Sequence, residues 1–291
     1  GTVGLKPTYG RISRHGLIAY ASSFDQIGPI THDIADAFLY TSVMAGPDAY
    51  DGTLFQESYA MQTQESKPLR IAVLKDCVHR EGLNAEVKAA FVNLTEKLKS
   101  QGHQVEEVNF PIVDQLVPTY YVLTTAEASS NLSRFDGIHF GYRSKEAKGI
   151  DLTYKKSRSE GFGEEVKRRI MLGTFVLSSG YYDAYYSRAQ KVRRLIQNKT
   201  NEILAQYDVI MTPTTADSAF EMGKKSADPI AMYLEDIFTV QANLSGHPAI
   251  SIPLGKKQNG MPFGVQILSR AFEENQLLCA AQQLNVCLKE S

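Results

Sequence analysis

The sequence predicts an α/β protein, and three neighbouring segments carry that prediction. An apolar run at residues 69–74 has the length and composition of a buried strand. Asn84 then begins a helix whose apolar residues share one face, and residues 105–110 form a second strand. The apolar face consists of Val87, Phe91, Leu94 and Leu98. A strand, a helix and a strand in this order are typical of a parallel βαβ unit.

The segments before this unit predict a helix preceded by loops. The first thirty residues are rich in glycine, serine and proline, which favours loops and short strands. Residues 33–45 carry a helical apolar spacing, and Gly46 and Pro47 end it. The spaced positions are Ile34, Ala37, Phe38, Thr41 and Met44.

The segments after the unit predict a helical region followed by more sheet. Residues 113–198 are mostly helical in pattern and rich in aromatic side chains. Strands are predicted at residues 208–212, 249–253 and 263–268. A helix is predicted between the first two strands, with Asp228 as N-cap and Pro229 in its first turn, and a last helix closes the chain. Because no repeat or linker interrupts residues 1–291, we expect a single domain. The family resemblance given below implies that this domain is incomplete.

The composition excludes several classes of protein. The 291 residues have a net charge of −1 with scattered lysines and arginines, so a direct nucleic-acid interface is not expected. The three cysteines fit neither a disulfide framework nor a zinc pattern, which favours a reducing, cytoplasmic location. We expect neither a bilayer-spanning segment nor a leader.

Known cofactor and catalytic motifs are also absent. The sequence contains neither glycine-rich phosphate-binding pattern, nor G-x-S-x-G, nor H-E-x-x-H. Its six histidines are dispersed and lack metal-ligand spacing. We therefore expect no metal and no cofactor in this chain.

Two early segments resemble a known family. Residues 4–13 (GLKPTYGRIS) and 22–29 (SSFDQIGP) are similar to the stretch that follows the serine-rich signature of amidase-signature enzymes. The resemblance implies the amidase-signature fold, with a central mixed β-sheet covered by helices on both faces. It also implies that the N-terminal part of that fold, with the catalytic serine, is missing from this chain.

Three later segments narrow the resemblance to the A subunits of tRNA-dependent amidotransferases. They are residues 127–137 (EASSNLSRFDG), residues 158–163 with 167–170 (RSEGFG, KRRI) and residues 180–186 (GYYDAYY). The implied activity is hydrolysis of glutamine to supply ammonia for converting Glu-tRNA(Gln) to Gln-tRNA(Gln), or Asp-tRNA(Asn) to Asn-tRNA(Asn). The implied partners are a B subunit, which carries the ATP, metal and tRNA sites, and a small C subunit that wraps the A subunit.

The resemblance assigns no catalytic residue to this chain. The family uses a serine nucleophile, a second serine in a cis peptide and a lysine, and a neutral, desolvated lysine can take a proton through the bridging serine. All three are expected upstream of Gly1. Lys6, Ser22 and Ser23 do not match these positions, so the chain alone is expected to be inactive.

By motif position, the resemblance implies that Tyr120, Arg169 and Asp236 bind glutamine. Arginine can form a fork of hydrogen bonds with the α-carboxylate, and a buried acid can meet the α-ammonium group. We assign Arg169 to the carboxylate and Asp236 to the ammonium group, with Tyr120 lining the pocket.

Each assignment has an alternative. Arg168 is an alternative to Arg169. The helical angle places Arg169 closer to Val166 and predicts that Arg169 is the more buried of the two. Arg169 could also form a surface pair with Glu165. Asp236 could be a solvated helix residue, yet its helical neighbours are mainly apolar or aromatic: Met232, Tyr233, Thr239 and Val240. Tyr120, beside Tyr121, could be ordinary core.

Two further clusters are expected to have structural roles. The aromatic residues of segment 181–186 could line a passage or shape the pocket, but they are predicted to pack in the core. Lys191, Arg193 and Arg194 are predicted to form a solvated helix face and not an RNA contact. Two other functions stay open at this point. One is a stand-alone amidase that acts on small amides, and the other is a non-catalytic interaction module with exposed sheet edges.

Overall fold

The computed structural model describes residues 1–62, 65–220 and 235–289, and these form two compact units. Unit 1 comprises residues 1–15, 26–117 and 194–291, and unit 2 comprises residues 16–25 and 118–193. The expectation of a single domain stays a prediction, and the predicted helix cap at Asp228 and Pro229 lies outside the described residues.

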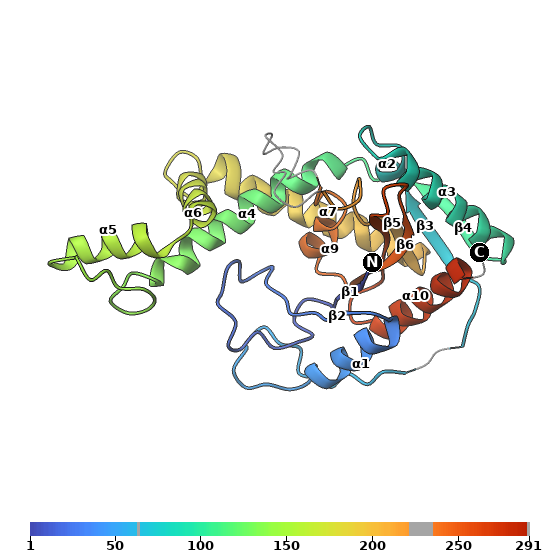
Figure 1. Ribbon diagram of the computed structural model, residues 1–291, viewed down its shortest axis with the longest axis horizontal. Coiled ribbons are helices and arrows are strands. Elements are labelled where there is room, and N and C mark those ends of the chain that lie inside the picture. Colours follow the sequence, from blue (N-terminus) through green and yellow to red (C-terminus); the bar gives the residue numbers. More distant parts are fainter. Residues whose placement is uncertain (63–64, 221–234, 290–291) are drawn as a thin grey trace. The chain divides into compact units, whose positions relative to one another are not determined.

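Unit 1 is built on a seven-stranded mixed sheet in the order β2-β1-β6-β7-β5-β3-β4 (Figure 1). Strands β3, β4 and β5 run parallel, and the remaining pairs are antiparallel. The strands are β1 (Val3–Lys6), β2 (Ile30–Thr31), β3 (Arg70–Leu74), β4 (Gln104–Val108), β5 (Val209–Pro213), β6 (Ala249–Lys256) and β7 (Pro262–Leu268).

The predicted βαβ unit is present. Helix α3 (Ala85–Ser100) connects β3 to β4, and the Oδ1 of Asn84 accepts a hydrogen bond of 2.9 Å from the backbone N–H of Glu86, as its N-cap role requires. Its predicted apolar face is buried. Helix α1 (Ile34–Met44) is likewise confirmed with Asp33 as N-cap, but Met44 at its end is exposed.

Helices cover both faces of the sheet, as expected from the predicted fold. On one face, α1, α3 and α10 (Glu274–Lys289) enclose the main apolar core with alternate residues of the strands, such as Val209 and Met211. On the other face, Gln266 of β7 donates hydrogen bonds to the Oγ1 of Thr212 and to the carbonyl of Phe238. The segment that enters α9 (Val240–Ser245) therefore covers the second face, and α9 is in turn hydrogen-bonded to α7 (Arg188–Gln206).

A buried ion pair attaches the start of α10 to the loop after β1. One carboxylate oxygen of Glu274 accepts from Nη2 of Arg11 at 2.9 Å, and the other accepts from the backbone N–H of Thr8 at 3.0 Å. Both charged side chains are buried, and the guanidinium also lies over the rings of Tyr59 and Phe272. The pair satisfies two charges that would otherwise be costly inside unit 1.

Unit 2 is helical, as predicted for the middle of the chain. Its helices α4 and α6 approach at Gly173, where an added Cβ would lie 1.9 Å from the carbonyl oxygen of Thr125. Glycine is therefore required at this crossing by space. Its elements are α4 (Leu116–Asn131, from Pro118 on), η2 (Leu132–Arg134), α5 (Ile150–Gly161), α6 (Glu164–Val176), the π-helical turn η3 (Asp183–Ser187) and the first residues of α7. Unit 1 also contains the short helices α2 (Lys75–Val78) and η1 (Val113–Gln115).

The aromatic segment 181–186 does not pack in the core, so that prediction is wrong for this chain. Tyr181, Tyr182 and Tyr185 are each more than two fifths exposed. The rings of Tyr181 and Tyr185 contact each other and Phe175 at the surface, with 4.4 Å between the centroids of Phe175 and Tyr181, while Tyr182 contacts Tyr186. Tyr181 and Tyr182 lie in a turn, and Tyr185 lies in the π-helical turn η3, so the spacing of a regular α-helix on which the prediction depended does not apply to this segment.

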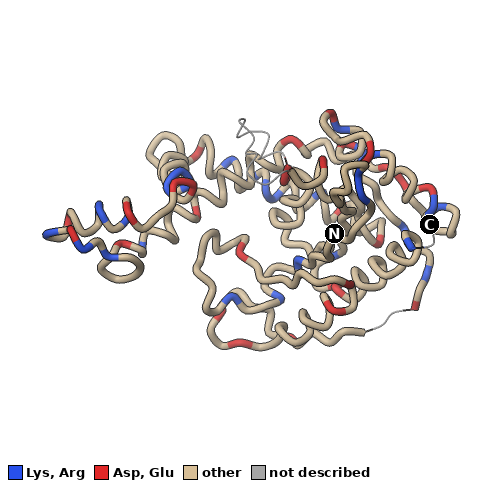
Figure 2. The backbone as a smooth tube through the Cα atoms, in the orientation of Figure 1, with Lys and Arg blue, Asp and Glu red and all other residues tan. Residues whose placement is uncertain are grey.

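Acidic and basic residues are interspersed along much of the described chain (Figure 2). Helix α7 departs from this pattern, since residues 188–199 carry five basic residues and no acidic one. Within the described part of the chain, no helix has both the length and the apolar character needed to cross a membrane. The described residues likewise contain no group of three or more histidine, cysteine or acidic side chains placed to hold a metal ion.

Candidate functional site

Arg169 lies on α6 in unit 2 and is the more enclosed of the two candidate arginines. Its side chain is 28% exposed, whereas that of Arg168 is 63% exposed, so the predicted difference is confirmed. Arg168 donates to Glu165, at 2.5 Å. Nε of Arg169 also donates to Glu165, at 2.9 Å, and its Nη1 donates to the phenol oxygen of Tyr20 at 2.8 Å. The proposed alternative of a Glu165 pair is thus real, but it occupies only one edge of the Arg169 guanidinium.

Two aromatic rings fix the plane of the Arg169 guanidinium. Its Cζ lies 5.5 Å from the ring centroid of Tyr20 and 5.7 Å from that of Tyr121. Partial burial works against the charged form, but the hydrogen bonds with Glu165 and Tyr20 raise the pKa of Arg169 above its ordinary value. Nη2 makes no hydrogen bond with any residue that the structure describes. The arginine therefore keeps its charge and presents an open donor.

Tyr120 lies on α4 in the same unit and close to this arginine. Its ring packs edge-on against Phe24, at 5.6 Å between centroids, and against Tyr121, at 5.4 Å. Tyr121 is the residue that Tyr120 and Arg169 share. Unit 2 thus brings two of the three predicted binding residues together, while Tyr120 is only half-buried.

Asp236 lies in unit 1, and its surroundings differ from those that the sequence predicted. It is exposed and occupies a turn, and its backbone carbonyl accepts from the N–H groups of Thr239 and Val240 as the chain enters α9. Two of its expected helical neighbours, Met232 and Tyr233, lie outside the described residues. The expectation of a buried carboxylate is therefore wrong for this chain, because Asp236 is exposed in the turn that precedes α9.

Segment 20–25 joins this cluster, and sequence reasoning missed it. The carboxylate of Asp25 accepts from the backbone N–H of Tyr20 at 2.9 Å, and Nδ2 of Asn131 donates to the carbonyl of Tyr20 at 3.1 Å. Arg193 lies 4.1 Å over the ring of Phe24 and donates to Ser23. The predicted solvated face at residues 191–194 is therefore wrong for Arg193. The tight turn residues around Asp25 were the available signal for an ordered segment.

A pocket of about 350 Å³ lies in unit 1 beside β1, β6 and α9. Nζ of Lys6 donates to the carbonyl of Pro7 at 2.9 Å and to Oε1 of Gln26 at 3.0 Å, and Gln26 donates to Asn243. Burial lowers the pKa of Lys6 to about 7, and the nearby negative charge of Glu274 opposes that shift only in part. Lys6 thus contributes to this pocket an amine that titrates near neutral pH, without matching the family's catalytic lysine.

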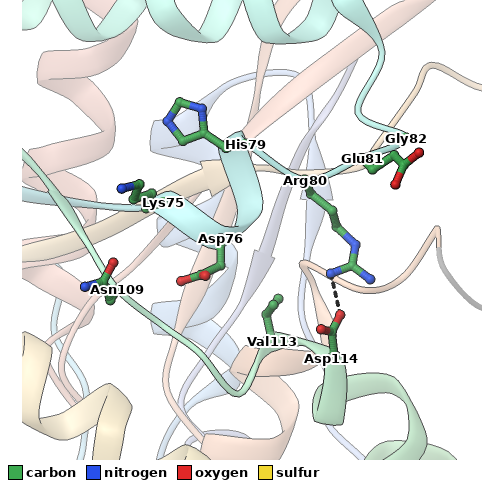
Figure 3. Close-up of a pocket in the computed structure, with 9 residues that line it drawn as sticks. All are labelled: Lys75, Asp76, His79, Arg80, Glu81, Gly82, Asn109, Val113 and Asp114. Carbon is green, nitrogen blue, oxygen red and sulfur yellow. Dashed lines mark hydrogen bonds and ion pairs between the residues drawn. The ribbon is translucent and has the colours of Figure 1, made fainter.

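Another pocket, of about 770 Å³, lies where the parallel strands β3 and β4 end (Figure 3). It contains none of the predicted binding residues. Arg80 is paired with Asp114 at 2.6 Å, as the dashed line in Figure 3 shows, and Asp76 accepts from the backbone N–H of Phe110. With these charges already satisfied by protein partners, this pocket is not the candidate site.

Comparison with known proteins identifies relatives over almost the whole chain. A family model described as Amidase matches residues 1–278. The A subunit of the Glutamyl-tRNA(Gln) amidotransferase of Brevibacillus brevis is 51% identical over 285 residues, which are 97% of this chain and 58% of that protein. The protein of the same name from Staphylococcus epidermidis is 49% identical over 97% of this chain and 59% of its own length. The chain thus spans less than two thirds of these curated relatives.

Solved structures agree with the fold. The crystal structure of the Glutamyl-tRNA(Gln) amidotransferase A subunit from Thermotoga maritima has a TM-score of 0.76 and 40% identity, and the match covers 96% of this chain and 56% of that one. The structure of 6-aminohexanoate cyclic dimer hydrolase has a TM-score of 0.74 at 22% identity, over 99% of this chain and 61% of that one. The second likeness concerns the fold alone.

Proposed function

Because the chain belongs to the amidase family, we propose that it forms the glutamine-binding part of a tRNA-dependent amidotransferase A subunit. The observation that carries the proposal is the guanidinium of Arg169, which unit 2 holds by its Nε and Nη1 atoms while Nη2 stays open. Identities of about 50% to curated A subunits support the same assignment over the whole chain.

Arg169 would receive the α-carboxylate of glutamine through the open edge of its guanidinium. By the family resemblance, Asp236 would meet the α-ammonium group, and Tyr120, whose ring packs against Tyr121, would line the pocket. These two contacts select a free amino acid, because a substrate without both charges leaves Arg169 and Asp236 unmatched. The serine, serine and lysine that hydrolyse the side-chain amide are expected outside this chain.

The ammonia released from glutamine would be used by a partner. In this proposal a B subunit binds ATP, metal and tRNA and amidates Glu-tRNA(Gln) or Asp-tRNA(Asn), and a C subunit wraps the A subunit. This chain itself would need neither cofactor nor metal. A cytoplasmic location follows from a role in forming aminoacyl-tRNA.

Replacement of Arg169 tests the proposal against a stand-alone amidase. In the polypeptide as its native gene encodes it, purified with its partners, Arg169→Ala should raise the KM for glutamine about 10- to 100-fold, since a hydrogen-bonded charge contact contributes about 1.5–3 kcal/mol. Arg168→Ala is the matched control, because its exposed side chain pairs with Glu165 alone among the described residues, and it should change KM less than about twofold. Unchanged glutamine turnover in Arg169→Ala would instead favour the stand-alone amidase.

A further inference from the structure

We propose that Tyr20 is a positioning residue that holds the Arg169 guanidinium in the orientation needed to receive a carboxylate. This inference rests on the proposed function, since it concerns the same substrate group. It is carried by two contacts within unit 2: the phenol oxygen of Tyr20 accepts from Nη1 of Arg169 at 2.8 Å, and the Tyr20 ring lies 5.5 Å from the guanidinium carbon.

An arginine that binds a carboxylate needs a defined plane. The guanidinium sits at the end of a long side chain, and every unconstrained torsion angle must be frozen when the ligand binds. Glu165 fixes Nε, Tyr20 fixes Nη1, and the rings of Tyr20 and Tyr121 limit rotation of the plane. The remaining edge of the guanidinium, with Nη2, is thereby oriented before the ligand binds.

Tyr20 suits this task better than Glu165 because it is neutral. Glu165 is 48% exposed and pairs with both Arg168 and Arg169, so its contact with Arg169 is solvated. Its negative charge also offsets the positive charge of Arg169. A phenol oxygen accepts the hydrogen bond without cancelling the guanidinium charge. Tyr20 therefore orients Arg169 while leaving its attraction for an anion intact.

The backbone of Tyr20 is itself fixed independently of Arg169. Its N–H donates to Asp25 at 2.9 Å, and its carbonyl accepts from Asn131 on α4 at 3.1 Å. The ring is thus presented from a segment anchored at both of its backbone polar groups. A preformed support of this kind is what a positioning residue requires.

Kinetics of Tyr20→Phe test the inference, because this change removes the hydroxyl and keeps the ring. In the native-gene polypeptide with its partners, we expect the KM for glutamine to rise about five- to tenfold, with kcat changed less than about twofold. Tyr40→Phe is the matched control, since Tyr40 on α1 is 54% exposed, and it should leave both constants unchanged. Thermal melting of each variant checks that the fold is retained.

Two further comparisons separate positioning from a general structural effect. Turnover of an amide substrate that lacks the α-carboxylate should be the same for Tyr20→Phe and the unchanged protein. In an Arg169→Ala background, Tyr20→Phe should have no additional effect on the KM for glutamine. Loss of turnover for both kinds of substrate, or full additivity with Arg169→Ala, would overturn the inference.

The outcomes also distinguish this inference from the proposed function. If Arg169→Ala raises the KM for glutamine but Tyr20→Phe does not, the positioning role of Tyr20 is wrong and the proposed function stands. If Arg169→Ala leaves that KM unchanged, the proposed carboxylate contact fails, and the role of Tyr20 fails with it.

Discussion

Glu274 places a negative charge inside unit 1, and both of its carboxylate oxygens are used. Its side chain is fully buried, as is nearly all of Arg11. Such a pair adds little over an apolar pair of equal volume, because desolvation opposes the attraction between the charges. Removing one partner is different, since it leaves the other charge buried and unmatched.

We therefore expect Glu274→Ala to lower the free energy of unfolding by about 3–5 kcal/mol, because Arg11 and the N–H of Thr8 lose their acceptor. Urea denaturation followed by circular dichroism measures the change. Glu96→Ala breaks an exposed pair with Lys99 and should cost less than about 0.5 kcal/mol. Equal losses in the two variants would contradict the buried role.

Lys6 should make stability depend on pH. Its pKa is lowered by burial from 10.5 to about 7, so above pH 7 the unfolded chain binds more protons at this residue than the folded chain does. The contribution of Lys6 to the free energy of unfolding therefore rises with pH, by up to about 1 kcal/mol per pH unit. We expect this rise between pH 7 and 8.5 in urea denaturation of the unchanged protein.

Lys6→Met isolates the effect, because methionine has a similar length and no charge. The unfolding free energy of this variant minus that of the unchanged protein should fall as pH rises from 7 to 8.5. Titration of the Cys77 thiol, whose pKa burial raises to about 12 in the folded chain, contributes equally to both proteins and cancels in this difference. A difference that is constant over the window would show that Lys6 keeps its ordinary pKa.

Individual site residues were predictable only where local geometry decides their surroundings. The angle around α6 separated Arg169 from Arg168 correctly, because both belong to one regular helix. Tyr20 was missed because its contact with Arg169 spans 149 residues and no local pattern encodes it. Asp236 was expected to be buried because of its apolar neighbours, but it lies exposed in the turn before α9, where spacing along a helix does not decide burial.

At the scale of elements, helix α6 crosses α4 at the distance that a glycine allows. A Cβ on Gly173 would lie 1.9 Å from the Thr125 carbonyl oxygen and 2.7 Å from Cβ of Ser129. In an open helix, replacing glycine by alanine gains about 0.5–1 kcal/mol. At this position the gain is reversed, because the two helices must separate to admit a methyl group.

Gly173→Ala should accordingly lower the free energy of unfolding by about 1–3 kcal/mol, the usual effect of overpacking a close contact. Gly52→Ala is the control, since a Cβ there would meet nothing within 4 Å, and it should be nearly neutral. Chemical denaturation of the two variants gives the comparison. A stabilised Gly173→Ala would mean that α4 and α6 do not pack this closely.

The elements themselves were largely predictable, whereas their pairing was not. Apolar spacing and caps identified α1, α3 and the strands β3 to β7, since these signals lie within each segment. The order β2-β1-β6-β7-β5-β3-β4 depends on contacts between distant segments, such as β1 with β6. No single segment carries that information, and the mixed sheet was expected only from family resemblance.

At the scale of the whole molecule, the two units should respond separately to a local defect. Each has its own set of internal contacts, and opening of one compact region does not require opening of another. Hydrogen exchange of Gly173→Ala should therefore be faster in α4 and α6 of unit 2, while the amides of β5 and β7 keep their protection. Equally increased exchange in β5 and β7 would contradict this independence.

The place of β5 in the sheet also determines the order in which the molecule can assemble. This strand lies between β7 and β3, yet about a hundred residues separate it from β4, and these include nearly all of unit 2. During synthesis, β3 and β4 are made long before β5, which pairs with the free edge of β3. The edge of β3 that pairs with β5 therefore stays unpaired while unit 2 is synthesised, and its open backbone groups expose the nascent chain to association during that interval.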